Sequence, residues 1–231
     1  MPLVSEIVDL GATYRGAREA VTQLVRTLSP EQLKTPVPAC PGWLVHDVVS
    51  HLTGVATDAF NGRLRDAGDE AQSAPQVVER TQTPTLVVLR EWERSASQFE
   101  VLLSRSGVSD LTPVFDVAVH EHDIRGALGL PDNRDDELIG LAVERATRLL
   151  LSKVDSAGLE PVVVVDDAGS VVAGDGDAPV TIRMSPFEFF RASFGRRSRS
   201  QIERRFRGTN EPGPYVPLLC LSPPAGADII E

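Results

Sequence analysis

The amino-acid sequence predicts an α+β protein in which an N-terminal antiparallel helical bundle is followed by a small α+β domain. Three observations lead to this fold class. Apolar residues recur at helical spacing through most of the region 1–158. Beyond this region the pattern changes to short β-branched runs separated by turn residues. The length of 231 residues, of which 42% are hydrophobic and 24% charged, suits one larger domain with a smaller one attached. We therefore expect domains at 1–158 and 159–231.

Five segments of the first domain are expected to be helical. The pattern of the first segment ends at Ser29-Pro30, and the second segment follows a connection, 31–42, in which several prolines disfavour helix. The fourth segment is closed by Gly129 and Pro131, a common stop signal. Most connections are short, which favours antiparallel neighbours in a bundle. The expected helices cover 4–28, 44–66, 83–105, 112–128 and 135–154.

The second domain is expected to begin with short strands, because valine-rich runs alternate with Asp and Gly turn residues. These runs are 161–165, 170–172 and 180–183. Ser185 is a typical N-cap residue for a following helix over about 186–194, with Pro186 at its first position. Residues 212–225 are rich in Pro and Gly and predict an extended tail laid over the surface.

Composition argues against several classes of function. No apolar stretch reaches the roughly 18–20 residues of a membrane span, and the N-terminal sequence lacks the pattern of a signal peptide. We expect a cytoplasmic protein with no membrane partner, as a monomer or homodimer. The formal net charge of −10 repels a phosphate backbone, so nucleic acid is not an expected partner. Cys40 and Cys220 stand far apart, outside any CxxC motif, and are expected to be reduced.

The histidines predict a metal site within the bundle. All four, at 46, 51, 120 and 122, fall in expected helices. Asp116 and His120 are four residues apart and so share one helix face. His51, on another helix, is the natural third ligand for a divalent ion held between helices. Two imidazoles and one carboxylate leave one coordination position open, which is the ligand count of a catalytic zinc site.

Other interpretations of these residues stay open. Asp116 and His120 can form an ordinary i,i+4 pair while His51 is a hydrogen-bonded core histidine. Asp47 also stands four residues from His51, and Glu121 is a further potential donor.

Two neighbours of His120 have different expected roles. His122 follows it by two positions, about 200° around the helix, and is expected to face elsewhere. Asp123 follows it by three and can accept the second ring N–H of His120, unless it is simply an exposed helix charge.

Three stretches of the sequence resemble the mycothiol-dependent maleylpyruvate isomerase family. They are 40–54 (CPGWLVHDVVSHLTG), 116–129 (DVAVHEHDIRGALG) and 185–201 (SPFEFFRASFGRRSRSQ). The resemblance implies a DinB-like metal-binding bundle with a C-terminal domain, and it implies His51, Asp116 and His120 as the metal ligands. Family members usually carry Glu where Asp116 stands, so this ligand is one methylene shorter.

The resemblance also implies a thiol-dependent isomerase or S-transferase. Mycothiol, a low-molecular-weight thiol, is the implied cosubstrate, and a divalent metal, best matched by Zn²⁺, would lower the pKa of its thiol. The thiolate would then attack a small electrophilic substrate. The alternative function is a non-catalytic metal-binding or thiol-binding module, such as a sensor or carrier.

Two further sets of residues are candidates for ligand contacts. Trp43 is a candidate for binding the thiol cofactor, although an anchor in the core is the simpler interpretation. Arginines are concentrated between Arg191 and Arg207, and guanidinium groups are suited to carboxylates. Arg196 and Arg197 are the candidate catalytic contacts to a substrate carboxylate, with a solvated helix face as the alternative.

Overall fold

The computed structural model describes residues 9–64, 70–105 and 111–231. It divides the chain into two compact units, Met1–Leu130 and Pro131–Glu231. The described part of the first unit is helical, and the second unit combines helices with a small mixed sheet, as the predicted fold class requires. Among the described residues, no helix is both long enough and apolar enough to cross a bilayer.

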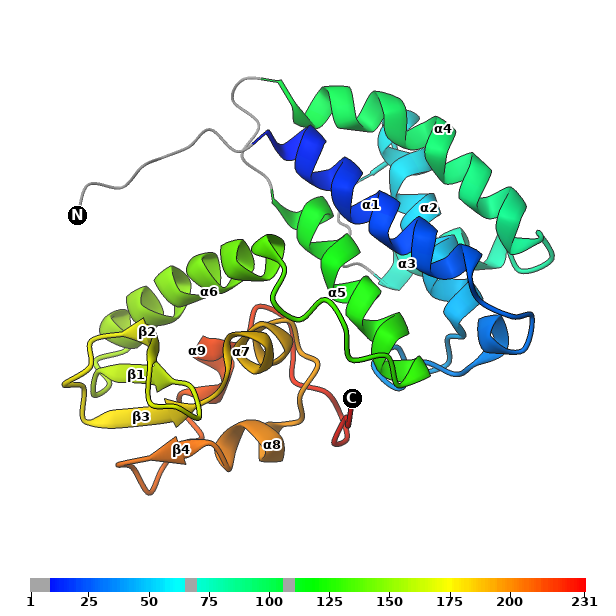
Figure 1. Ribbon diagram of the computed structural model, residues 1–231. Coiled ribbons are helices and arrows are strands. Elements are labelled where there is room, and N and C mark those ends of the chain that lie inside the picture. The colour runs from blue at the N-terminus through cyan, green and yellow to red at the C-terminus, as the bar shows by residue number, and fades with distance from the viewer. Residues whose placement is uncertain (1–8, 65–69, 106–110) are drawn as a thin grey trace. The chain divides into compact units, whose positions relative to one another are not determined.

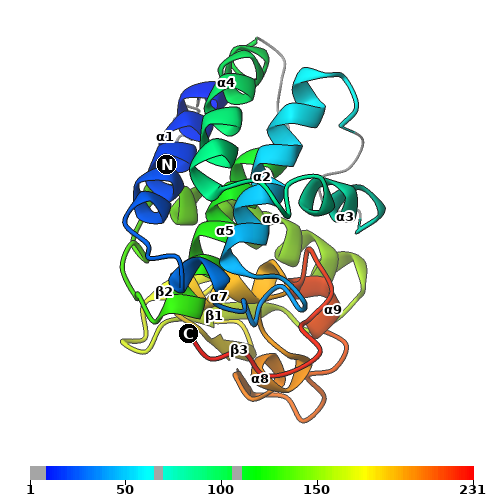
Figure 2. The same cartoon turned by 90° about the vertical axis from the view of Figure 1, so that its right-hand side faces the viewer.

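The first unit is a helical bundle arranged around its second long helix. Its elements are α1 (Leu10–Arg26), α2 (Val45–Phe60), α3 (Glu70–Val78), α4 (Thr85–Leu103) and α5 (Thr112–Leu128), with a short 3-10 turn at Gln32–Lys34. Helix α2 contacts α3, α4 and α5, whereas α1 contacts α4 and α5 (Figures 1 and 2). Side chains of α2 therefore meet side chains of three other helices in the interior.

The predicted apolar stripes form the core of this bundle. Val48 and Leu52 of α2 are buried, as is Trp92 of α4. Each such apolar side chain contributes about 1.5–3 kcal/mol on burial. The indole Nε1 of Trp92 donates to the hydroxyl of Tyr14 in α1 at 3.0 Å, so its polar atom is satisfied inside the bundle. This contact ties α4 to α1.

Helix α5 begins and ends at the predicted residues, and α1, α2 and α4 lie within their predicted ranges. The predicted parts of the first two helices at 4–8 and 65–66 lie outside the described residues. Helix α3 was not predicted. It has only nine residues and contains Pro75 in its interior, so its position depends on packing against α2.

The second unit contains α6 (Glu137–Ser156), β1 (Val162–Val165), β2 (Val171–Gly174), β3 (Val180–Arg183), α7 (Pro186–Ser193), α8 (Arg199–Glu203), β4 (Phe206–Arg207) and α9 (Val216–Leu219). The strand order is β2-β1-β3-β4. Strands β1 and β3 are parallel, with Val164 opposite Ile182, and the two outer pairs are antiparallel. Both of these residues are buried, together with Phe189 and Phe190 of α7.

Two features of the second unit differ from the predictions. The boundary between units lies at 130/131 and not at 158/159, because α6 contacts α7, α9 and β2. Its apolar stripe was read correctly, but a stripe does not reveal which neighbours will bury it. The stretch 212–225 is also not simply an extended surface tail, because it contains α9 with Val216 and Leu219 fully buried.

Candidate metal centre

A tight turn precedes the helix that carries the first predicted ligand. The amide of Trp43 donates to the carbonyl of Cys40 at 2.9 Å, and Gly42 has a φ of +85°. A proline followed by a glycine with positive φ is typical of the two central positions of a type II turn. The carboxylate of Asp47 then accepts the amide of Leu44 at 2.9 Å and stabilises the start of α2. The turn thus places Cys40 and Trp43 just before α2.

The three predicted metal ligands lie together in the first unit. Nε2 of His51 in α2 lies 3.5 Å from Oδ2 of Asp116 in α5. Nε2 of His120, one turn further along α5, lies 3.5 Å from Oδ1 of the same carboxylate. One donor atom from each residue lies within 4.8 Å of the other two. Both histidines are buried, and the carboxylate is 17% exposed.

These separations suit ligands of one ion better than direct hydrogen bonds. A nitrogen-to-oxygen distance of 3.5 Å exceeds the roughly 2.7–3.2 Å of an N–H···O hydrogen bond. A tetrahedral ion with bonds of about 2.0–2.1 Å holds neighbouring nitrogen and oxygen ligands about 3.3 Å apart. Two imidazole nitrogens and one carboxylate are also the donor set of a catalytic zinc site with one open position. The residues present therefore fit a divalent ion such as Zn²⁺.

The other nitrogen of each imidazole contacts an acceptor. Nδ1 of His120 lies 2.9 Å from Oδ2 of Asp123, and Nδ1 of His51 lies 2.9 Å from Oε1 of Gln76. In a neutral imidazole, an acceptor at Nδ1 leaves the Nε2 lone pair free to face Asp116. Of the two roles considered for Asp123, the structure shows the contact with the second ring nitrogen of His120 and not an exposed helix charge. Gln76 was not predicted, because it lies on the helix that the sequence pattern did not indicate.

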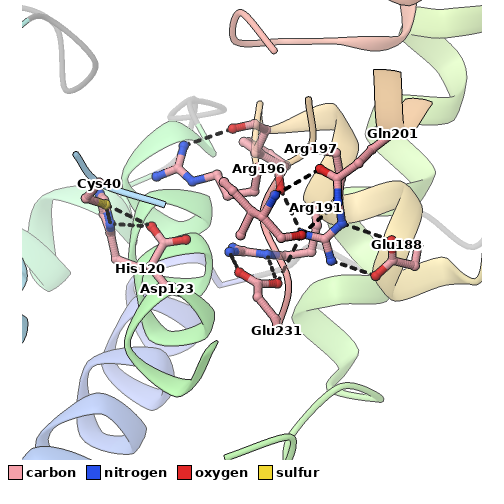
Figure 3. A network of polar contacts seen from close by, with 11 residues as sticks. Cys40, His120, Asp123, Glu188, Arg191, Arg196, Arg197, Gln201 and Glu231 are labelled. Atoms are coloured by element: carbon pink, nitrogen blue, oxygen red, sulfur yellow. Dashed lines mark hydrogen bonds and ion pairs between the residues drawn. The ribbon is translucent and has the colours of Figure 1, made fainter. Parts of the chain in front are cut away.

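Cys40 lies next to His120 and Asp123 in the first unit. Its Sγ donates to Oδ2 of Asp123 at 3.3 Å and lies 3.7 Å from Nδ1 of His120 (Figure 3). Cys40, His120 and Asp123 form a second group of potential metal ligands, but this group uses the other nitrogen of the shared histidine. Because Asp123 already contacts that nitrogen, we interpret the second group as a hydrogen-bonded support and the first group as the candidate centre.

The ring of Trp43 is stacked with that of His120 and tilted against that of His51. Its ring centroid lies 5.1 Å from that of His51 and 6.2 Å from that of His120. The residue is partly exposed. It therefore offers an aromatic surface next to the candidate centre and is not wholly a core anchor. This position is compatible with the predicted role in binding the thiol cofactor.

The two remaining histidines have other surroundings. His122 is buried, but it belongs to neither group of potential metal ligands found among the described residues. The expectation that it faces away from His120 stays a prediction. Nδ1 of His46 lies 2.9 Å from the hydroxyl of Thr85, and its Nε2 lies 3.2 Å from the carbonyl of Arg80. His46 thus links α2 to the start of α4.

The predicted arginines lie in the second unit, where Arg197 takes part in a network of ion pairs. Its guanidinium donates to both carboxylate oxygens of Glu188, at 2.9 and 2.6 Å, and to Glu231 at 3.2 Å (Figure 3). Glu231 also pairs with the fully buried Arg191. Burial opposes both charges, but the pairing outweighs it, so the pKa of Glu188 is lowered and the pKa of Arg197 is raised. Arg196 donates to a backbone carbonyl at 2.9 Å.

The two predicted arginines differ in their contacts and therefore in their expected roles. A guanidinium held by two carboxylates, as in Arg197, is suited to stabilising the fold of its unit. Arg196 stays a predicted contact for a substrate carboxylate.

Comparison with known proteins identifies a family for the N-terminal part of the chain and a similar fold for most of it. Residues 14–125 match the family model of the mycothiol maleylpyruvate isomerase N-terminal domain. No curated protein matches the chain.

Two similar solved structures are both crystal structures of the mycothiol-dependent maleylpyruvate isomerase. A mutant form with one histidine replaced by alanine is 14% identical, with a TM-score of 0.55 over 81% of this chain and 88% of that chain. The other is 13% identical, with a TM-score of 0.49 over the same shares, 81% and 88%. The first likeness confirms the predicted fold, a DinB-like bundle followed by a smaller α+β part.

Proposed function

Since residues 14–125 belong to the mycothiol maleylpyruvate isomerase N-terminal domain family, we propose that this protein is a mycothiol-dependent enzyme. It acts on a small electrophilic substrate, either as an isomerase or as an S-transferase. The observation that carries the proposal is the convergence of two Nε2 atoms on one carboxylate, each 3.5 Å away. Such a centre suits an enzyme that must hold a thiol in its reactive form.

In this proposal His51, Asp116 and His120 hold a divalent ion, with Zn²⁺ as the best match to the donor set. When bound, the ion lowers the pKa of a thiol placed beside it, so that the thiolate forms near neutral pH. The nucleophile belongs to the cosubstrate, because the thiol of the protein's own Cys40 donates a hydrogen bond to Asp123 at 3.3 Å.

The surrounding residues orient the ligands and limit access to them. Asp123, 2.9 Å from Nδ1 of His120, favours the tautomer of that imidazole whose Nε2 lone pair faces Asp116. Trp43 shields one side of the two rings and offers a flat surface to the cosubstrate. Excluding water on that side strengthens the electrostatic interactions at the centre.

An activity measurement tests this proposal. Protein loaded with Zn²⁺ is incubated with mycothiol and maleylpyruvate, and then with other conjugated cis-enones, epoxides and alkyl halides, while product formation is followed by chromatography. We expect turnover that needs mycothiol, stops on chelation and is absent in Asp116→Ala. The matched control is a mycothiol analogue with serine in place of cysteine, which should support no turnover. Binding of metal and thiol without turnover on any substrate would instead indicate a sensor or carrier.

A further inference from the structure

We propose that Gln76 and Asp58 form a hydrogen-bonded relay that sets the tautomer of His51, which makes Gln76 a positioning residue of the centre. The proposal deepens the proposed function, since it rests on His51 acting as a ligand through Nε2. The relay crosses two helices, because Asp58 and His51 both lie on α2 whereas Gln76 lies on α3.

The contacts determine the direction of each hydrogen bond. Oε1 of Gln76 lies 2.9 Å from Nδ1 of His51, and Nε2 of Gln76 donates to Oδ2 of Asp58 at 2.8 Å. The guanidinium of Arg63 pairs with the other oxygen of Asp58 at 3.1 Å. An ionised carboxylate only accepts hydrogen bonds, so the NH₂ group of Gln76 must face Asp58 and its oxygen must face His51.

The tautomer of His51 follows from that orientation. The oxygen of an amide cannot donate, so Nδ1 of His51 must carry the proton. In a neutral imidazole the other nitrogen, Nε2, then has the lone pair, and it is this atom that faces Asp116. Both residues of the inner hydrogen bond are shielded from water, with His51 2% and Gln76 3% exposed. Water is therefore a poor substitute acceptor for Nδ1.

A glycine on α2 makes the close approach of Gln76 possible. A Cβ atom at Gly54 would lie 2.4 Å from Cβ of Gln76 and 2.5 Å from its Cγ. Gly54 follows His51 by three residues, so it lies on the same side of α2. Without a side chain at this position, α3 can bring the amide of Gln76 up to the imidazole. The glycine and the glutamine therefore act together in orienting His51.

The relay can be removed and rebuilt with side chains of similar size. Gln76→Leu removes the acceptor for Nδ1 and keeps an apolar side chain of comparable volume. Gln76→Glu alone would place two carboxylates against each other, since Asp58 lies 2.8 Å from the Gln76 amide nitrogen. The double variant Gln76→Glu/Asp58→Asn avoids this clash, because the new amide donates to the new carboxylate, which in turn accepts the hydrogen bond from Nδ1–H of His51.

The first measurement reads the tautomer in metal-free protein. Long-range proton–nitrogen NMR correlation of ¹⁵N-histidine-labelled protein distinguishes a protonated Nδ1 from a protonated Nε2. We expect His51 of the wild type and of the double variant to be protonated at Nδ1, and Gln76→Leu to lose this preference. Gln98→Leu, which makes the same substitution at an exposed position of α4, is the matched control and should keep the wild-type signal.

The second measurement is Zn²⁺ affinity by competition with a chromogenic chelator. Loss of a ligand-orienting partner typically lowers metal affinity about 10–100-fold, so we expect a loss of that size in Gln76→Leu. The double variant should recover most of it. A wild-type His51 protonated at Nε2 would overturn the relay, even if Gln76→Leu failed to fold. So would unchanged tautomer and affinity in a folded Gln76→Leu. If the wild type shows the Nδ1 tautomer but binds no Zn²⁺, the relay stands and the proposed metal function fails.

Discussion

Asp116 faces both candidate histidine ligands with different oxygens, each 3.5 Å from an Nε2 atom. Its side chain is one methylene shorter than the Glu usual in the family that the sequence resembles. We expect Asp116→Glu to retain metal, with affinity within about tenfold of the wild type, because the longer carboxylate can still reach the same point. Asp116→Ala should weaken Zn²⁺ binding by more than that. Chelator competition measures both variants, and an unchanged affinity in Asp116→Ala would exclude this carboxylate as a ligand.

The histidines give a second residue-scale prediction. His51→Ala and His120→Ala should each lose most of the bound metal, because each removes one of three protein ligands. His122→Ala removes a buried imidazole of α5 that is outside both groups of potential ligands found in the described ranges, and it should keep the metal. Elemental analysis after reconstitution with Zn²⁺ measures the metal content, and circular dichroism checks the fold. Equal loss in all three variants would contradict the assignment.

Residues on one helix could be related from the sequence, whereas residues on different helices could not. The spacing of Asp116, His120 and Asp123 along α5 correctly predicted that their side chains meet. The position of Gln76 against His51 depends on how α3 packs on α2, and that helix is short and contains Pro75, which by itself argues against a helix. The contact of Cys40 with Asp123 similarly depends on the path of the loop before α2.

The bounds of single helices were predicted better than the elements against which these helices pack. The bounds of α5 were correct because local signals define them, and Gly129 indeed closes the helix with a φ of +66°. Helix α6 was also predicted, but it was expected in the first domain, whereas the structure groups it with the second unit. An amphipathic pattern is the same whichever surface buries it. Short elements such as α8, α9 and β4 have two to five residues and carry almost no pattern of their own.

At the start of α7, Glu188 gives a prediction about pH. Its pKa is lowered because the hydrogen bond and charge of Arg197 outweigh the effect of burial. A carboxyl group with a lowered folded-state pKa stabilises the fold above its unfolded pKa of about 4.3, and this contribution is lost as pH falls through the folded value. Glu188→Gln should therefore lower the free energy of unfolding by about 1–3 kcal/mol at pH 7.

The same variant should lose less stability than the wild type when the solution is acidified below about pH 5. Urea unfolding of both proteins between pH 7 and pH 3 measures this difference. The matched control is Glu144→Gln, which makes the same substitution at an exposed carboxylate of α6. Gln201→Glu is less suitable, because the side chain of Gln201 accepts a hydrogen bond from a backbone amide at 2.9 Å. Parallel stability profiles for Glu188→Gln and the wild type would show that the ion pair contributes nothing.

Over the whole molecule, the candidate metal centre and the arginine-rich segment lie in different units. The matched family model and the candidate centre both fall in the first unit. The arginine-rich segment of the second unit is largely neutralised by acids of the same unit. These pairs are Arg191 with Glu231, Arg197 with Glu188 and Glu231, Arg199 with Glu203, Arg204 with Asp228, and Arg205 with Glu188. A cluster that looks basic in the sequence is therefore mostly a set of ion pairs.

The central claim is that a centre formed by His51, Asp116 and His120 binds an external thiol, and the spectrum of Co²⁺-substituted protein tests it most directly. We predict a sulfur-to-cobalt charge-transfer band that grows with added mycothiol, with release of a proton as the thiol deprotonates. The serine-containing analogue should give no band. Cys40→Ser should behave like the wild type, because the sulfur must come from the cosubstrate. A band already present before any thiol is added, or a Co²⁺ spectrum that does not respond to mycothiol, would contradict the account.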